Sequence, residues 1–262
     1  MGKLKQLVFI YVLCVFSQNC CAQNYQITYE IVYQPNKIDS TKEKSTYLLN
    51  INPETNVSLF SAMSKDDMLN MKVYKDFSSD SFIKYESLSD ISYRMNYDFE
   101  PNWILTNETK IIRGYESQKA EIAFGGRTWE AWYTKEIPFQ NGPYKFSGLP
   151  GLIMEIYSID QDYHFTAVSI ERKESGVIEK LKAIPFQNEE QEKKYKMEIV
   201  ADPALQYRKN MAQLKSQNMG IRVTFNSKEI TPKDSERMIV EEFREWKAKH
   251  NNPIEKDMIW IK

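Results

Sequence analysis

The chain has 262 residues, of which 42% are hydrophobic, and its 35 basic and 36 acidic side chains give a net charge of −1. Its lysines are mixed with acidic residues in stretches such as 179–182 and 189–196, so the chain lacks a basic surface for phosphates, and we exclude nucleic acid as a partner. All three cysteines lie in the first 22 residues, so the rest of the chain has no thiol for disulfides, catalysis or metal binding.

Residues 1–22 have the pattern of a secretion signal. Lys3 and Lys5 precede an apolar stretch at 7–16, and small residues lead to Ala22. The apolar stretch is too short to span a bilayer comfortably, and no later stretch approaches the roughly 20 apolar residues that a membrane-spanning helix needs. We therefore expect cleavage after Ala22, a single domain at 23–262, and a periplasmic, cell-surface or extracellular location. We do not expect an integral membrane protein.

The first segment after this signal predicts a β-strand with one buried face. Tyr25, Ile27, Tyr29, Ile31 and Tyr33 alternate with polar residues, and the pattern stops at a proline. Shorter strand-like runs follow at 46–51, 57–61, 81–86, 92–97 and 103–112, with a short helix expected at 65–72. Short strands at such spacing favour an antiparallel sheet.

Gly125-Gly126 gives the clearest local signal, because a two-glycine loop fits the positive-φ turns of β-hairpins. It joins the strand-like runs 117–124 and 127–134. The register places Glu121 opposite Glu130, and Lys119 opposite Trp132. A second hairpin is expected from 152–159 and 163–172.

The last third of the chain predicts helices at 188–200, at 204–215 and after Thr231-Pro232. Asp202 is the expected N-cap of the second helix. The buried side of the third helix is expected to consist of Met238, Val240, Phe243 and Trp246. The predicted fold is mainly β (α+β): a large curved antiparallel sheet carries two or three helices on one face. Periplasmic lipoprotein carriers offer a fold-level analogy.

A segment rich in glycine and proline separates the two hairpins. It contains Ile137-Pro138 and Gly142-Pro143-Tyr144-Lys145-Phe146, and it ends in Gly148-Leu149-Pro150-Gly151-Leu152-Ile153. With Gly114-Tyr115 and Trp132-Tyr133-Thr134 before it, this order of elements resembles the GLPGLI family. The resemblance implies an exported protein of Bacteroidetes-type bacteria. It implies no catalytic residue and no cofactor, because no activity is established for that family.

Cations and aromatic rings near this loop are candidates for gripping a ligand or a partner. These candidates are Arg127, Trp132, Tyr133, Tyr144, Lys145 and Phe146. The motif residues Gly148, Leu149, Pro150, Gly151, Leu152 and Ile153 are expected to set the backbone path. The alternative interpretation is that the rings pack in the core, with Trp132 covered by the C-terminal helices.

The sequence therefore favours a non-catalytic exported protein for binding or envelope assembly, whose partner is an apolar small molecule, a lipid or an outer-membrane protein. One alternative is a cation-assisted or acid/base hydrolase that uses Glu121 and Glu130, although Lys119 beside them favours a neutralised surface cluster. Another alternative is a purely structural partner of an outer-membrane complex. Because His164 and His250 are far apart in the sequence, and no metal or cofactor motif occurs, we expect no metal and no cofactor.

Overall fold

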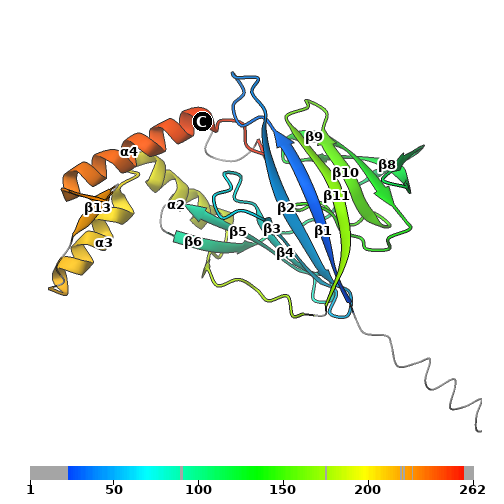
Figure 1. Cartoon of the computed structure of the whole chain (residues 1–262), viewed down its shortest axis with the longest axis horizontal. Coiled ribbons are helices and arrows are strands. Elements are labelled where there is room, and N and C mark those ends of the chain that lie inside the picture. Colours follow the sequence, from blue (N-terminus) through cyan, green and yellow to red (C-terminus); the bar gives the residue numbers. More distant parts are fainter. Residues whose placement is uncertain are drawn as a thin grey trace, which may run out of the picture.

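The computed structural model describes residues 23–88, 91–174, 176–218, 220, 222–225 and 227–256. The expected secretion signal at 1–22 and the apolar residues 258–260 lie outside this described part. A twelve-stranded sheet dominates the molecule, and Figure 1 shows it as a large curved surface with the helices to one side.

The sheet takes its strands from the whole chain between residues 23 and 185. They are β1 (Gln23–Tyr33), β2 (Glu43–Asn52), β3 (Val57–Ala62), β4 (Lys72–Asp76), β5 (Ser81–Leu88), β6 (Ile91–Asn96), β7 (Ile104–Ile112), β8 (Tyr115–Phe124), β9 (Arg127–Thr134), β10 (Leu152–Ser158), β11 (Tyr163–Glu174) and β12 (Ile184–Pro185). Their order across the sheet is β12-β6-β5-β4-β3-β2-β1-β11-β10-β9-β8-β7. Every neighbouring pair is antiparallel except β12 and β6. The predicted fold class is confirmed, with one short parallel pair at the edge.

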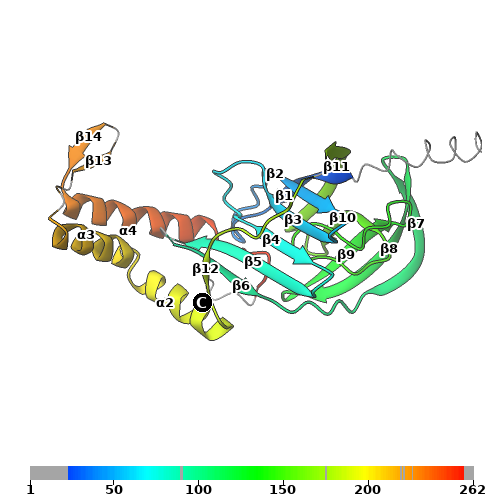
Figure 2. The same cartoon turned by 90° about the horizontal axis from the view of Figure 1, so that it is seen from below.

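Strand β1 lies near the middle of the sheet, between β2 and β11. Its side chains alternate as the sequence predicts: Ile27, Tyr29 and Ile31 are fully buried, while the intervening residues are half-buried. Trp129 and Phe165, from β9 and β11, belong to the same core. Figure 2 shows the strands from β7 to β10 bending round this core, so its face of the sheet is concave.

Both predicted hairpins are present. In the first, Glu121 of β8 lies opposite Glu130 of β9, and Lys119 lies opposite Trp132, as the two-glycine turn predicts. In the second, β10 pairs with β11.

The expected helix at 65–72 is wrong. These residues form turns and bends before β4 begins at Lys72. The Asp67 carboxylate accepts hydrogen bonds from the Tyr47 hydroxyl and from the backbone N–H of Asn70. An aspartate that binds the backbone three residues ahead favours a turn over a helix.

Three helices and a small hairpin form the last third of the described chain. They are α2 (Glu189–Ala201), α3 (Leu205–Ser216), β13 (Val223–Phe225), β14 (Lys228–Ile230) and α4 (Pro232–Lys249). Thr231 caps α4 by accepting a hydrogen bond from the N–H of Asp234, and Pro232 is its first residue, as predicted. Asp202 does not cap α3: it ends α2, and Ala204 precedes α3 without a side-chain cap.

The helices differ in how they meet the sheet. Helix α2 packs on β5 through Lys84, whose Nζ lies 2.9 Å from Oε1 of Glu192. Helix α3 lies beside α4 in both views, away from the sheet (Figures 1 and 2). None of the side chains of α4 is buried, so the predicted apolar side of this helix is only half-covered.

Candidate functional site

The glycine- and proline-rich loop between β9 and β10 is held by a lysine from another part of the sheet. The side chain of Lys75, on β4, is fully buried. Its Nζ donates to Oδ1 of Asn141 at 3.1 Å, to the carbonyl of Gly142 at 3.1 Å and to the carbonyl of Phe146 at 2.9 Å. Burial lowers the pKa of this ammonium well below its ordinary value. The loop therefore has a fixed path against β4.

Two motif glycines sit where a side chain would be costly. A Cβ at Gly151 would lie 1.9 Å from the carbonyl oxygen of Thr134, so only hydrogen fits there. Gly148 has φ +86°, and a Cβ would lie 2.6 Å from Cγ of Pro101. Both positions therefore have space for a glycine and not for a larger residue without a shift of the neighbouring atoms.

Arg127 joins the β8–β9 hairpin to the C-terminal segment, which we define as residues 252–256. Its Nη1 lies 2.6 Å from Oδ2 of Asp160 and 2.7 Å from Oδ2 of Asp162. Its remaining nitrogens donate to the Asn252 side chain and to the carbonyls of Pro253 and Ile254. The fork of a guanidinium suits this role, because one side chain can bind several acceptors in fixed directions.

Tyr144 and Lys145 bind the same C-terminal segment. The Tyr144 hydroxyl donates to Oε1 of Glu255, and the Nζ of Lys145 lies 2.6 Å from that oxygen. The Lys145 ammonium also lies 5.0 Å from the ring centre of Tyr97 and 5.6 Å from that of Phe124.

All six predicted binding residues are buried: Arg127, Trp132, Tyr133, Tyr144, Lys145 and Phe146 are at most 7% exposed. They are not all brought together, because Trp132, whose indole N–H donates to Glu130, lies on the opposite face of the sheet from Phe146. Tyr133 donates to Oε1 of Gln118, and Phe146 packs on Trp129 with ring centres 4.8 Å apart. Trp132 is covered by the Lys110 ammonium, 4.2 Å from its ring centre, and not by the C-terminal helices. Tyr144 lines the cavity described next, and a binding role for all six residues stays a prediction.

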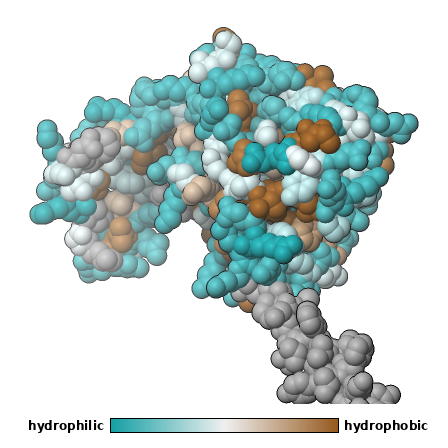
Figure 3. Space-filling model, turned by 45° about the vertical axis from the view of Figure 1, so that its right-hand side comes forward, coloured by the Kyte–Doolittle hydropathy of each residue, from teal (hydrophilic) through white to brown (hydrophobic). Residues whose placement is uncertain are grey.

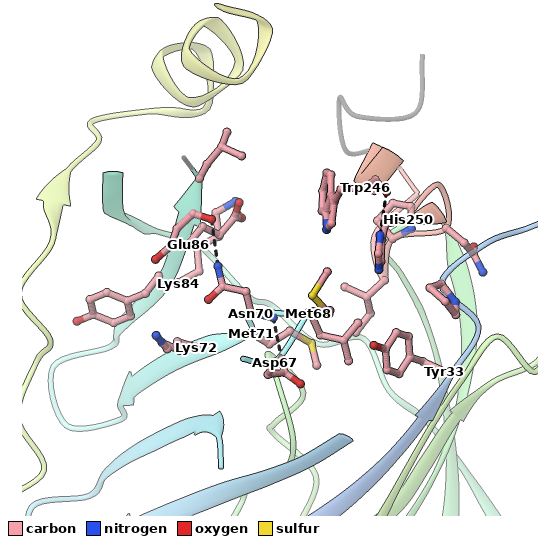
Figure 4. Close-up of a pocket in the computed structure, with 18 of the residues that line it drawn as sticks. Tyr33, Asp67, Met68, Asn70, Met71, Lys72, Lys84, Glu86, Trp246 and His250 are labelled. Carbon is pink, nitrogen blue, oxygen red and sulfur yellow. Dashed lines mark hydrogen bonds and ion pairs between the residues drawn. The ribbon is translucent and has the colours of Figure 1, made fainter. Parts of the chain in front are cut away.

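A cavity of about 650 Å³ opens between the sheet and α4. One wall is the turn segment before β4, with Met68, Leu69 and Met71. The opposite wall is α4, whose residues Ile239, Phe243 and Trp246 recur at the spacing of one helix face. Figure 4 shows Trp246 and His250 on one side of this space, and Glu86 and Lys84 on the other.

Tyrosines and the C-terminal segment also contribute to the lining. Tyr33, Tyr144 and Tyr163 belong to it, and so do Asn252, Pro253 and Ile254. The Tyr163 hydroxyl donates to the Asn252 carbonyl at 2.6 Å. The Tyr33 hydroxyl donates to Oε2 of Glu43 at 2.7 Å, so both polar tips are bound within the protein while their rings form part of the lining.

One acidic group at the cavity is neutralised by neighbouring ammonium groups of the protein. Glu86 of β5 is one of the lining residues. Burial tends to raise the pKa of its carboxyl, but Lys196 and Lys84, together with a hydrogen bond from Tyr93, lower it from 4.5 to about 2. Glu86 is therefore a carboxylate at neutral pH, paired with two ammonium groups.

The imidazole of His250 is also held within the wall. Its Nδ1 lies 2.8 Å from the carbonyl oxygen of Trp246, and its ring stacks on the indole with centres 5.3 Å apart. Five further charged residues line the cavity: Lys65 and Glu242 are exposed, Asp67 and Lys72 are half-buried, and Lys84 is buried. The cavity thus combines apolar side chains with charged groups, some of them exposed and some buried.

The predicted pair of carboxylates lies on the other face of the sheet. The Nζ of Lys119 lies 3.2 Å from a carboxylate oxygen of Glu121 and 3.2 Å from one of Glu130. Burial tends to raise the pKa of Glu130, but hydrogen bonds from Tyr157, Lys119 and Trp132 lower it. Both carboxylates are ion-paired, which favours the structural interpretation over proton sharing.

Within the described ranges, no group of three or more histidine, cysteine, aspartate or glutamate side chains is arranged to hold a metal ion. None of the described helices is both long and apolar enough to cross a membrane. On the face shown in Figure 3, apolar residues form separate patches in a mainly hydrophilic surface.

Solved structures with similar folds share little sequence with this chain. Two structures of PNGF-II match with a TM-score of 0.48 and 18% and 17% identity, over 64% of this chain. This chain spans 31% and 32% of those chains, about a third of their length.

Two smaller proteins match as well. An uncharacterized conserved protein from Thermus thermophilus has a TM-score of 0.39 and 8% identity, over 69% of this chain and 99% of its own. A LolA superfamily protein from Nitrosomonas europaea has a TM-score of 0.30 and 7% identity, over 60% of this chain and 88% of its own. A search of curated proteins gave no match. The model of one family matches residues 124–155, which run from the β8–β9 turn through the glycine- and proline-rich loop into β10, and that family is described as a protein of unknown function (Porph_ging).

Proposed function

We propose that the protein is an exported, non-catalytic binding protein that holds an apolar small molecule or a lipid chain in the cavity between the sheet and α4. The observation that carries this proposal is the pair of apolar walls, Met68, Leu69 and Met71 facing Ile239, Phe243 and Trp246. A volume of about 650 Å³ lies within the range of small-molecule sites, roughly 300–1,000 Å³.

The chemistry of the walls suits a flexible apolar chain. Methionine side chains are unbranched and polarisable, so they adapt to ligands of different shape. The helix supplies flat rings from Phe243 and Trp246, which are half-buried without a ligand. Covering them would remove apolar surface from water, at roughly 25 cal/mol per Å².

The N-terminal pattern at 1–22 supports export of a single domain, residues 23–262. The resemblance to the GLPGLI family supports the same location, the periplasm or the cell surface. The family model of unknown function matches the same loop. We therefore assign the protein to a GLPGLI-type family of exported proteins as part of this proposal.

Two neighbouring residues of α4 offer a matched test. Ile239 lines the cavity, whereas Val240 is absent from its lining, and both are half-buried β-branched residues. Binding of the fluorescent probe N-phenyl-1-naphthylamine is measured for the chain and for Ile239→Asp and Val240→Asp. We expect Ile239→Asp to weaken binding about tenfold or more, which is 1.4 kcal/mol, with little change for Val240→Asp. Equal effects of the two changes, or no binding by any form, would contradict a cavity site.

A protein partner is the second candidate, and the edge strand β7 favours it. Ile104, Leu105 and Ile111 on this strand are 67%, 51% and 69% exposed. An exposed apolar edge can pair with a strand of another chain. Crosslinking in the cell envelope followed by mass spectrometry should recover one specific outer-membrane protein, and should lose it when Thr109→Pro blocks the edge.

A further inference from the structure

Four charged side chains form a network where β5 and α2 meet, and two of them line the cavity. We call Lys84, Glu86, Glu192 and Lys196 the ion network, and Lys84 and Glu86 are its lining members. The Nζ atoms of Lys84 and Lys196 lie 2.9 and 2.7 Å from Oε1 of Glu192. The cavity therefore has a charged side as well as apolar walls.

Glu86 is the most exposed member of the ion network. Its side chain is 21% exposed, whereas those of Lys84, Glu192 and Lys196 are 10%, 8% and 2% exposed. Figure 4 shows Glu86 across the cavity from Trp246. A ligand that extends across the cavity from this ring therefore meets the carboxylate of Glu86.

The two oxygens of Glu86 differ in how strongly they are bound. Oε2 lies 2.8 Å from Nζ of Lys196 and 2.7 Å from the Tyr93 hydroxyl, which donates to it. Oε1 lies 3.3 Å from Nζ of Lys84, which is longer than the roughly 2.7–2.9 Å of a strong bond between charged groups. Because a carboxylate oxygen accepts about two hydrogen bonds, Oε1 has capacity for a further donor.

The charges of the ion network balance one another, and this balance selects the kind of donor. Lys84 and Lys196 supply two positive charges, and Glu86 and Glu192 supply two negative charges. An ammonium group on a ligand would add a positive charge beside the two lysines, and a carboxylate would face Glu86 with like charge. A hydroxyl group is neutral and still donates a hydrogen bond, so it avoids the cost of a partly buried charge without a partner.

We propose that the ligand is an apolar chain that ends in an uncharged hydroxyl group, and that this hydroxyl donates a hydrogen bond to Oε1 of Glu86 while the chain lies against Phe243 and Trp246. The inference rests on the proposed function and deepens it by naming the polar end of the ligand. Glu86 then fixes the direction of the ligand in the cavity. A long-chain alcohol and a lipid with an uncharged, hydroxylated headgroup share this chemistry.

Two isomers test the hydrogen bond on the unaltered chain. 1-Dodecanol and 1-methoxyundecane contain the same atoms, but only the alcohol has a hydroxyl donor. Each is used to displace the probe N-phenyl-1-naphthylamine from the chain that begins at Gln23, at pH 7. We expect the alcohol to bind about tenfold more tightly than the ether, and also more tightly than dodecanoate and dodecylammonium. Equal affinities of the alcohol and the ether, or tighter binding of either ion, would overturn the inference.

A matched pair of variants assigns the effect to Glu86. Glu242 also lines the cavity, but it lies on α4 and is exposed. Glu86→Met should bring the affinity ratio of alcohol to ether close to one, whereas Glu242→Met should leave it near tenfold. Glu86→Gln keeps the shape of the side chain, loses its charge and should lower the ratio about threefold. An unchanged ratio in the folded Glu86 variants would contradict the role of this residue.

The outcomes separate this inference from the proposed function. If the unaltered chain binds neither the probe nor the alcohol, the proposed function fails and the inference fails with it. If the probe is bound but the alcohol and the ether displace it equally, only the inference fails. A comparison with 1-monododecanoylglycerol, which should also bind more tightly than the ether, identifies the source: tighter binding than 1-dodecanol indicates a lipid headgroup, and weaker binding indicates a simple alcohol.

Discussion

The Nζ of Lys145 lies 2.6 Å from Oε1 of Glu255, which joins the glycine- and proline-rich loop to the C-terminal segment. Tyr144 donates to the same carboxylate, and Arg127 binds the preceding residues of that segment. Residues 252–254 form part of the cavity wall. The glycine- and proline-rich loop therefore contributes to the cavity mainly by positioning this wall.

Removing Arg127 should release the C-terminal segment. Its side chain is fully buried and binds Asp162, which is 3% exposed, so Arg127→Ala leaves that carboxylate with Lys37 as its remaining cation. We expect a loss of about 3 kcal/mol in the free energy of unfolding, measured with urea, and faster hydrogen exchange in residues 252–256. The exposed Arg172 is the control, because Arg172→Ala should cost less than about 0.5 kcal/mol. Similar losses for both variants would contradict this role.

The buried Lys75 should make the free energy of unfolding depend on pH in the alkaline range. Its pKa in the folded protein lies well below the ordinary 10.5, so between these two values the unfolded chain holds more protons. The free energy of unfolding should therefore rise with pH up to about 10.5, and Lys75→Met should abolish this rise.

The same variant should loosen the loop. Lys75→Met removes the donor to three oxygens, so we expect faster hydrogen exchange around residues 141–146. The net change in stability should stay within about 2 kcal/mol, because the cost of burying an amine disappears as well. Lys72→Met, on the same strand but half-buried, should leave the exchange and the pH dependence unchanged.

The close approach at Gly151 should make this glycine irreplaceable. A methyl group there meets the Thr134 carbonyl, so Gly151→Ala should cost about 3 kcal/mol or more. Gly114 is the control for backbone strain alone, since it has φ +87° but no atom within 4 Å of an added Cβ. Gly114→Ala should cost about 1–2 kcal/mol in urea unfolding. If the two variants were equally stable, the contact would not matter.

Glu86 should contribute to acid unfolding. Its folded pKa of about 2 lies below the ordinary 4.5, so its contribution to stability is complete above about pH 5 and is lost as the pH falls towards 2. Unfolding followed at pH 7 and pH 3 should show a smaller loss on acidification for Glu86→Gln than for the unaltered chain. The exposed Glu54→Gln should behave like the unaltered chain.

The sequence predicts those structural features that depend on residues close together in the chain. Gly125-Gly126 specifies its turn by itself, so the register of Glu121 with Glu130 follows from the sequence. The prediction for α4 is half right: Phe243 and Trp246 lie at the cavity, whereas Ile239 takes the place expected for Met238 and Val240, which do not line it.

Contacts between distant residues could not be predicted. Lys75 meets Asn141 across 66 positions, and nothing in the strand pattern marks this lysine as buried. As a cation among aromatic residues, Arg127 is predicted to bind a ligand or a partner. Its acceptors Asn252 and Ile254 instead lie in the chain's own C-terminal segment, 125 and 127 positions away. The sequence wrongly predicts a helix at 65–72, because the hydrogen bond from the Tyr47 hydroxyl to Asp67 comes from a strand that is distant in the sequence.

The most direct test of the central claim is the native mass of the protein isolated from its own cell envelope, measured before and after extraction with organic solvent. The account predicts one bound apolar molecule per chain that extraction removes, and no such species on Ile239→Asp. A native mass equal to that of the chain alone in every preparation, with the Ile239→Asp variant indistinguishable from the unaltered protein, would contradict it.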